Sequence, residues 1–127
     1  MPLVKISLKK GKALAFKNHL SQSVHQALVA EFKIPNDDLF QIIGEFDAEN
    51  IIYPQNYLGI NHTRDIIYIS ITAKQGRSIE MKKALYKTIA SNISESTGHS
   101  NADVIITLIE NTEEDWSFGN GEAQLIA

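Results

Sequence analysis

The chain carries one pattern of residues twice, at a separation of 65 positions. Residues 3–8 alternate apolar and polar side chains as a strand does, and from about residue 13 to residue 32 apolar residues recur every three or four positions, as on an amphipathic helix. The same order returns in a strand at 66–72 and a helix that begins at Ser78 and ends at Gly98. The positions that match across the two halves are Gly11 with Gly76, Lys12 with Arg77, Phe16 with Met81, Leu20 with Leu85, and Val24 with Ile89.

This repeat predicts the fold class. Each half continues into a second strand, at 39–46 and at 104–110, so each half is a β-α-β unit. Because such crossovers are right-handed, two units in tandem place both helices on the same side of one sheet. We therefore expect an α+β fold, with a four-stranded sheet and two helices on one face.

The rest of the chain reads as connections within a single domain, residues 1–127, whose size suffices for a buried core. The first β-α-β unit covers about 2–46, an excursion about 47–65, the second unit about 66–110, and a tail about 111–127. In the tail, 119–121 reads Gly-Asn-Gly and predicts a tight turn. Residues 122–126 form a possible short strand that could pair with a neighbouring subunit.

The expected strands carry apolar residues on both faces. In the strand at 66–72, Ile67, Ile69 and Ile71 alternate with Ile66 and Tyr68, and the last strand likewise divides its apolar residues between two faces. The helices cover only one side of the sheet, so the other side needs a partner. This predicts an oligomer.

Composition excludes several function classes. The chain has no cysteine, which rules out disulfides and thiolate chemistry and suits a cytoplasmic protein. A net charge of −3 argues against nucleic acid as a partner, and no apolar run is long enough to span a membrane. The four histidines are scattered and do not form a helical ligand pair, so we expect no metal.

Proline follows the initiator methionine, directly before the first strand. Pro2 is a small residue of the kind that favours removal of Met1. Removal would leave a secondary amine at the start of a folded strand, where it could transfer protons. Many chains have proline at this position, so the argument depends on the other motifs.

Four segments together carry a resemblance to a known family: Pro2-Leu3-Val4-Lys5, the stretch from Ile34 to Gln41, Gly76-Arg77-Ser78, and Glu110-Asn111 followed by residues 115–121, which read Asp-Trp-Ser-Phe-Gly-Asn-Gly. From end to end the chain resembles the tautomerase superfamily, which includes 4-oxalocrotonate tautomerase, and most closely its malonate semialdehyde decarboxylase-like branch. The resemblance implies a homotrimer, no cofactor, and an active site at the amino-terminal proline.

The resemblance also implies roles for individual residues. Pro2 is the catalytic amine, Asp38 its acid-base partner with Asp37 as the adjacent rival, and Arg77 the carboxylate binder. Trp116 and Phe118 form the pocket wall. The family pattern has a second arginine two residues before Arg77, but this chain reads Lys74-Gln75-Gly76-Arg77, so Gln75 or Lys74 takes its place. Neither reproduces a planar two-point grip on a carboxylate.

The protonation state of the amine decides between two reactions. An apolar wall and Arg77 favour neutral Pro2, which would act as a general base on a small enol or 2-oxo acid, whereas Asp38 favours the ammonium. The ammonium would suit decarboxylation or hydration of a 3-oxo acid of the malonate semialdehyde type. We expect the tautomerase reaction, which requires only Pro2 and one cation. A non-catalytic trimeric binding or signalling protein is the remaining alternative.

Overall fold

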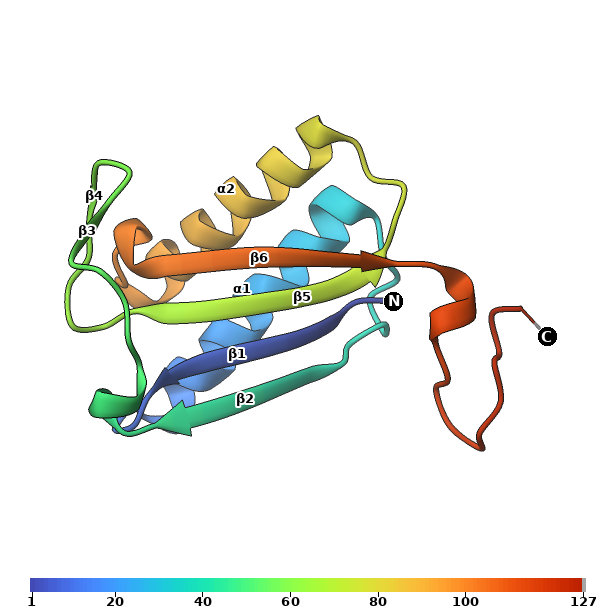
Figure 1. Cartoon of the computed structure of the whole chain (residues 1–127), viewed down its shortest axis with the longest axis horizontal. Helices are drawn as coiled ribbons and strands as arrows, with labels where there is room; N and C mark the ends of the chain where they lie inside the picture. Colours follow the sequence, from blue (N-terminus) through green and yellow to red (C-terminus); the bar gives the residue numbers. More distant parts are fainter. Residues whose placement is uncertain (127) are drawn as a thin grey trace.

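The computed structural model describes residues 1–126 and shows a four-stranded sheet with two helices packed on one side (Figure 1). The strand order is β2-β1-β5-β6, with β1 parallel to β2, β5 parallel to β6, and β1 antiparallel to β5. The principal elements are β1 Leu3–Lys9, α1 Leu14–Phe32, β2 Gln41–Phe46, β5 Ile67–Lys74, α2 Ile79–Thr97 and β6 Val104–Asn111. The predicted fold class is confirmed.

The two halves match in backbone conformation as well as in sequence. Gly11 and Gly76 precede the two helices with φ angles of 108° and 119°, in the left-handed region that glycine adopts most readily. Each helix ends on a left-handed residue, Lys33 in the first half and Gly98 in the second. The Ser78 side chain caps α2 by accepting a hydrogen bond from the Met81 N–H at 3.2 Å.

The core lies between the sheet and the helices. Along β5, Ile67, Ile69 and Ile71 are buried and the residues between them are only partly buried, as strand periodicity requires. The repeat-related helix residues Leu20 and Leu85 are both fully buried against this face. Apolar side chains from both halves therefore form one core, which explains why the two units share one sheet.

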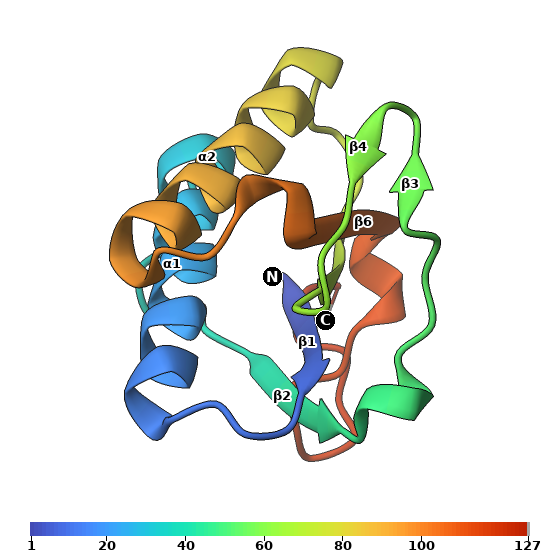
Figure 2. The same ribbon diagram turned by 90° about the vertical axis from the view of Figure 1, so that its left-hand side faces the viewer.

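The opposite face of the sheet has no helix. In Figure 2 both helices lie to the left of the sheet. On the open face the side chains of Ile42 and Ile109 are 57% and 51% exposed, and Tyr68 and Ile105 are half-buried. The expectation that both faces of the sheet carry apolar residues is confirmed.

The segment between the halves contains structure that its weak periodicity did not reveal. A short 3-10 helix, η1 (Ala48–Asn50), is followed by a small hairpin of β3 (Asn56–Tyr57) and β4 (Ile60–Asn61). A second 3-10 helix, η2 (Asn101–Asp103), precedes β6, and a third, η3 (Glu113–Asp115), follows it. Two-residue strands are too short to show alternation in a sequence.

The tail after β6 is partly as expected. The tight turn at 119–121 is confirmed, since the Glu122 N–H donates to the Gly119 carbonyl at 3.2 Å. The possible strand at 122–126, predicted to pair with a neighbouring subunit, is not formed in the single chain, where residues 124–126 form a turn. The Gln124 side chain instead bonds back to Phe118 and Gly119, and this local closure replaces strand pairing.

Candidate active site

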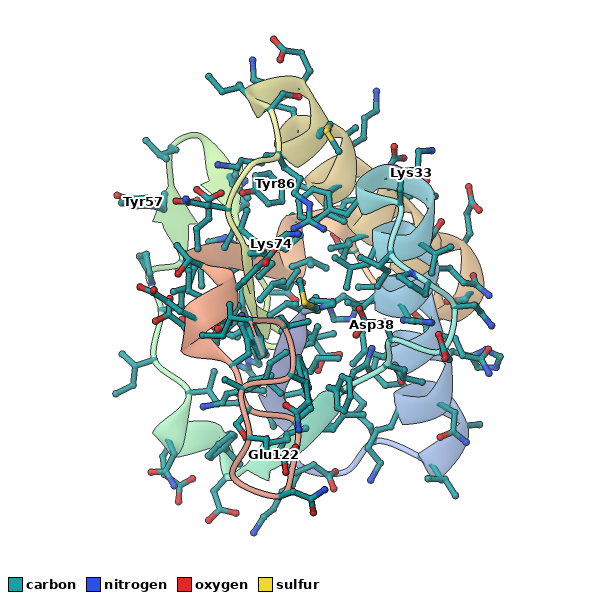
Figure 3. All side chains as sticks on the ribbon, turned by 90° about the vertical axis from the view of Figure 1, so that its right-hand side faces the viewer. Lys33, Asp38, Tyr57, Lys74, Tyr86 and Glu122 are labelled. Carbon is teal, nitrogen blue, oxygen red and sulfur yellow. The ribbon has the colours of Figure 1, made fainter. Side chains whose placement is uncertain are left out.

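Most of the residues predicted to form the site lie at one edge of the sheet, where β1 starts and where β5 and β6 end. Leu3 at the start of β1 pairs with Thr72 near the end of β5, and Lys74 pairs with Asn111 at the end of β6. The amino terminus and the tail after β6 therefore lie at the same end of the molecule, on the right in Figure 1. Figure 3 looks onto this end, with Asp38 and Lys74 labelled.

Asp38 faces the amino terminus. The Met1 ammonium donates a hydrogen bond to the Asp38 carboxylate. Two contacts fix the loop that carries this aspartate: the Asp38 N–H donates to the Pro35 carbonyl at 3.1 Å, and the buried His25 ring bonds to the Asn36 carbonyl at 2.7 Å. Asp37 is exposed. The geometry therefore favours Asp38 over its neighbour as the carboxylate beside the terminal amine.

Pro2 is buried, and Met1 is joined to it. The Pro2 nitrogen is therefore a peptide nitrogen in the chain as described. Removal of Met1 would convert it into the terminal amine, one residue further along the same strand. The Val4 N–H donates to the Phe40 carbonyl at 3.0 Å, so the start of β1 is held against the segment that carries Asp38.

An aromatic wall stands next to the start of β1. The Trp116 and Phe118 rings stack, with centroids 5.4 Å apart and an angle of 7°, and Phe40 packs against Phe118 at 5.5 Å. They border a hollow of about 460 Å3, lined by Leu3, Phe40, Thr72, Asn111, Asp115, Trp116, Ser117 and Phe118. The structure thus brings the two predicted wall residues together and adds Phe40, which sequence reasoning did not assign.

The orientation of Trp116 depends on Asn111. The indole Nε1–H donates to Asn111 Oδ1 at 2.8 Å, and the Asn111 backbone carbonyl accepts from the Gln75 N–H at 2.8 Å. One residue at the end of β6 therefore holds both the aromatic wall and the turn after β5. The sequence marks Asn111 as part of a motif, but a hydrogen bond between two loop-borne polar groups has no pattern that reveals it.

The polar residues of the turn after β5 are separated from one another. Lys74 and Gln75 line a second hollow of about 470 Å3, together with Thr112, Glu113, Glu114 and Ile126. The Lys74 ammonium pairs there with Glu113 at 3.3 Å. Arg77 is not among the residues that line either hollow: its Nη1–H donates to the Lys74 carbonyl at 2.7 Å, and its guanidinium lies 4.8 Å from the centre of the Phe32 ring.

Cavity size alone does not identify the site. A larger hollow, of about 620 Å3, lies at the opposite edge of the sheet beside η1. The amino-terminal edge is the candidate active site, because a terminal amine beside a carboxylate, with an aromatic wall at the same edge, is a set of groups that can transfer protons. Within residues 1–126 no group of three or more acidic or histidine side chains could hold a metal ion, and no helix is long and apolar enough to cross a bilayer.

Comparison with known proteins points to one family. Two family models, each described as tautomerase enzyme, match residues 38–119 and residues 2–59. The probable tautomerase YusQ of Bacillus subtilis (strain 168) is 44% identical over 126 residues, which cover 99% of each chain.

Solved structures agree with this result. FG41 malonate semialdehyde decarboxylase, inhibited by 3-bromopropiolate, superposes with a TM-score of 0.92 at 32% identity, over 98% of this chain and 94% of the other. A fused 4-OT that forms a symmetric trimer, Q0, shares the fold, with a TM-score of 0.79 at 23% identity over 98% of each chain.

Proposed function

The chain belongs to the tautomerase family and is a tautomerase enzyme, and from this premise we propose that its catalytic group is the amine of Pro2, freed when Met1 is removed. The observation that carries the proposal is the contact between the Met1 ammonium and Asp38, at the edge of the sheet where Leu3 and Phe40 line the aromatic hollow. A carboxylate at hydrogen-bonding distance from a terminal amine can orient it and exchange a proton with it. The substrate we propose is a small enol or 2-oxo carboxylic acid.

The proposed reaction moves a proton and leaves the oxidation level unchanged. Neutral Pro2 takes the hydroxyl proton of the enol, and the electrons of that O–H bond form the carbonyl. The carbon–carbon double bond then accepts a proton from the prolinium at the distal carbon, which restores the neutral amine. The stacked rings of Trp116 and Phe118 exclude water from one side of the substrate, and Asp38 holds the amine in place.

We assign the substrate carboxylate to Arg77, although its guanidinium lines neither hollow in the single chain and would have to turn toward the substrate. Its guanidinium carries five N–H donors in a fork that fits a carboxylate, and the hydrogen bond to Lys74 uses one of them. The Phe32 ring beneath it holds the guanidinium plane. Lys74 and Gln75 are a second, weaker pair of substrate contacts, since the Lys74 ammonium is shared with Glu113.

Decarboxylation or hydration of a 3-oxo acid is the second candidate, and the same ion pair favours it. A carboxylate beside the amine stabilises the ammonium, the form that polarises a carbonyl. FG41 malonate semialdehyde decarboxylase, at 32% identity, supports this alternative. Against it stands the turn after β5, where Gln75 or Lys74 replaces the second arginine that the decarboxylase pattern has.

The test follows ketonisation of simple enol 2-oxo acids by ultraviolet absorbance in the wild type, Pro2→Ala and Arg77→Ala. We expect Pro2→Ala to lower kcat by about 100-fold or more, the contribution of a positioned acid-base group, and Arg77→Ala chiefly to raise KM. Carbon dioxide release from a 3-oxo acid, measured in parallel, separates the two candidate reactions. Equal ketonisation rates in all three proteins would leave only a binding role for this site.

We further propose that the enzyme is a homotrimer. The open face of the sheet, with Ile42 and Ile109 more than half exposed, supplies an apolar surface of the kind that subunits bury. The fused 4-OT that shares this fold forms a symmetric trimer. Light scattering coupled to size exclusion tests the assembly: a mass of three chains is expected, and a monomer at micromolar concentration would refute it.

A further inference from the structure

The opposite edge of the sheet repeats the architecture of the active site. The turn after β5 reads Lys74-Gln75-Gly76-Arg77, and the turn after β1 reads Lys9-Lys10-Gly11-Lys12 at the matching positions. Both glycines have positive φ angles, and both turns lead into a helix. The basic turn after β1 is therefore the counterpart of the turn that we assign to substrate binding.

The wall of the site is repeated too. A 3-10 helix follows β2 just as one follows β6, since η1 at 48–50 and η3 at 113–115 are 65 residues apart. At the same spacing Ile51 matches Trp116 and Tyr53 matches Phe118. The second edge thus keeps a basic turn, a 3-10 helix and an apolar wall in the same relative order along the chain.

The catalytic groups are not repeated. The counterpart of Pro2 is Ile67, which lies inside the chain and offers no amine. The counterpart of Asp38 is Asp103, whose carboxylate accepts the Thr63 N–H at 2.9 Å and the Thr63 hydroxyl at 2.5 Å. The Thr63 hydroxyl and backbone N–H thus contact Asp103 as the Met1 ammonium contacts Asp38 at the other edge. Because neither donor is an amine, this edge cannot perform amine chemistry.

A cavity nevertheless remains there. A recess of about 170 Å3 is lined by Lys9, Ala48, Ile51, Tyr53, Arg64 and Ile66. Four of these residues, Ala48, Ile51, Tyr53 and Arg64, also line the 620 Å3 hollow, so the recess lies next to that wider hollow. At about 30 Å3 for each water molecule, the recess has the volume of five to six waters, which suits an acid of a few carbon atoms.

The recess has a surplus of positive charge. Lys10 pairs with Asp47 at 3.1 Å and Lys12 with Asp65 at 2.7 Å, so these charges are already neutralised. Lys9 and Arg64 line the recess, and neither forms an ion pair with any residue in the part of the chain that the structure describes. Burial, together with the charges of Asp103 and Asp65, raises the pKa of Tyr53, which keeps its hydroxyl neutral.

We propose that this recess binds a small carboxylate anion and does not turn it over. Lys9 and Arg64 would hold the carboxylate, as Arg77 does in the site at the other edge, and Ile51 and Ile66 would contact the short hydrocarbon part. The enzyme would then carry, in each chain, one catalytic carboxylate site and one binding site related to it by the internal repeat. The second site depends on neither Pro2 nor Asp38.

The test is a titration of the 15N-labelled full-length protein with 2-oxopropanoate, at an ionic strength kept constant with sodium chloride. Saturable shifts are expected for the amides of Ala48, Ile51 and Tyr53. The double variant Lys9→Gln/Arg64→Gln should weaken binding at this edge by about tenfold or more, because it removes the two charged donors. Amides of Asn111 and Trp116 report on the catalytic edge separately in the same spectra.

The control variant at the other edge is Arg77→Gln, which changes the residue that we assign to the substrate carboxylate there. It should weaken the response of the Asn111 and Trp116 amides and leave the response at the recess unchanged. The proposal is overturned if the recess amides shift equally in sodium chloride alone, fail to saturate, or keep their affinity in the double variant. Because the two edges are read independently, loss of binding at one does not decide the other.

Discussion

Replacing either of the two repeat-related aspartates by asparagine separates a structural role from a catalytic one. Asp103 is 1% exposed, and its carboxylate accepts two hydrogen bonds from Thr63, at 2.9 and 2.5 Å. Asp103→Asn replaces one acceptor oxygen by a donor, so one Thr63 donor loses its partner and faces another N–H. A hydrogen bond to a charged group contributes about 1.5–3 kcal/mol, and an unpaired buried donor costs about 1–3 kcal/mol.

We therefore expect Asp103→Asn to lower the free energy of unfolding by about 2–4 kcal/mol, the lower end applying if the Thr63 hydroxyl rotates to a new acceptor. Asp38 has one side-chain partner, the Met1 ammonium, and its own side chain is 15% exposed, so Asp38→Asn should cost about 1 kcal/mol, less than Asp103→Asn, but abolish most of the ketonisation activity. Urea unfolding of both variants at one protomer concentration provides the comparison. The reasoning fails if Asp103→Asn lies within about 0.5 kcal/mol of the wild type, or if both variants lose the same stability.

Three further variants test separate parts of the structure. Asn111→Ala removes the acceptor that holds the Trp116 indole, which should weaken substrate binding by about 1 kcal/mol. KM should therefore rise about fivefold and the tryptophan fluorescence should change, whereas an unchanged KM would contradict the positioning role. The Lys12 hydrogen bond lowers the pKa of the Asp65 carboxyl, so the pair stabilises the fold above pH 3.8 and less as pH falls; Asp65→Asn should lower the free energy of unfolding in urea at pH 7 by less than about 1 kcal/mol, and the difference from the wild type should narrow in acid. Leu85→Ala empties a fully buried position and should cost about 2–5 kcal/mol in urea unfolding, where a smaller loss would show that the core collapses around it.

The fold was largely predictable because its periodicities are long and occur twice. The helix stripes that include Leu20 and Leu85 and the alternation along β5 correspond to buried positions, and the glycines before each helix mark where the period changes. The hairpin of β3 and β4 and the turn at 124–126 were not predicted. Their geometry is set by a few local hydrogen bonds, such as those of Gln124, which leave no periodic signal.

The site was predictable in its residue types and only partly in its geometry. Trp116 and Phe118 stack and line a hollow, as the predicted wall requires. That Asp38 rather than Asp37 contacts the Met1 ammonium required the structure, because the loop is held by His25. The Arg77 guanidinium contacts a backbone carbonyl and a phenylalanine ring rather than a hollow. Such side-chain orientations depend on tertiary neighbours that no spacing in the sequence reveals.

The central claim is that the amine of Pro2 performs the chemistry, and a comparison of two forms of the wild-type chain tests it directly. The first form is protein whose intact mass shows that the chain begins at Pro2. The second form retains Met1 and is prepared from cells in which methionine aminopeptidase is inhibited. Ketonisation of an enol 2-oxo acid should be at least about 100-fold faster in the form that begins at Pro2. Equal kcat/KM values for the two forms would contradict the account.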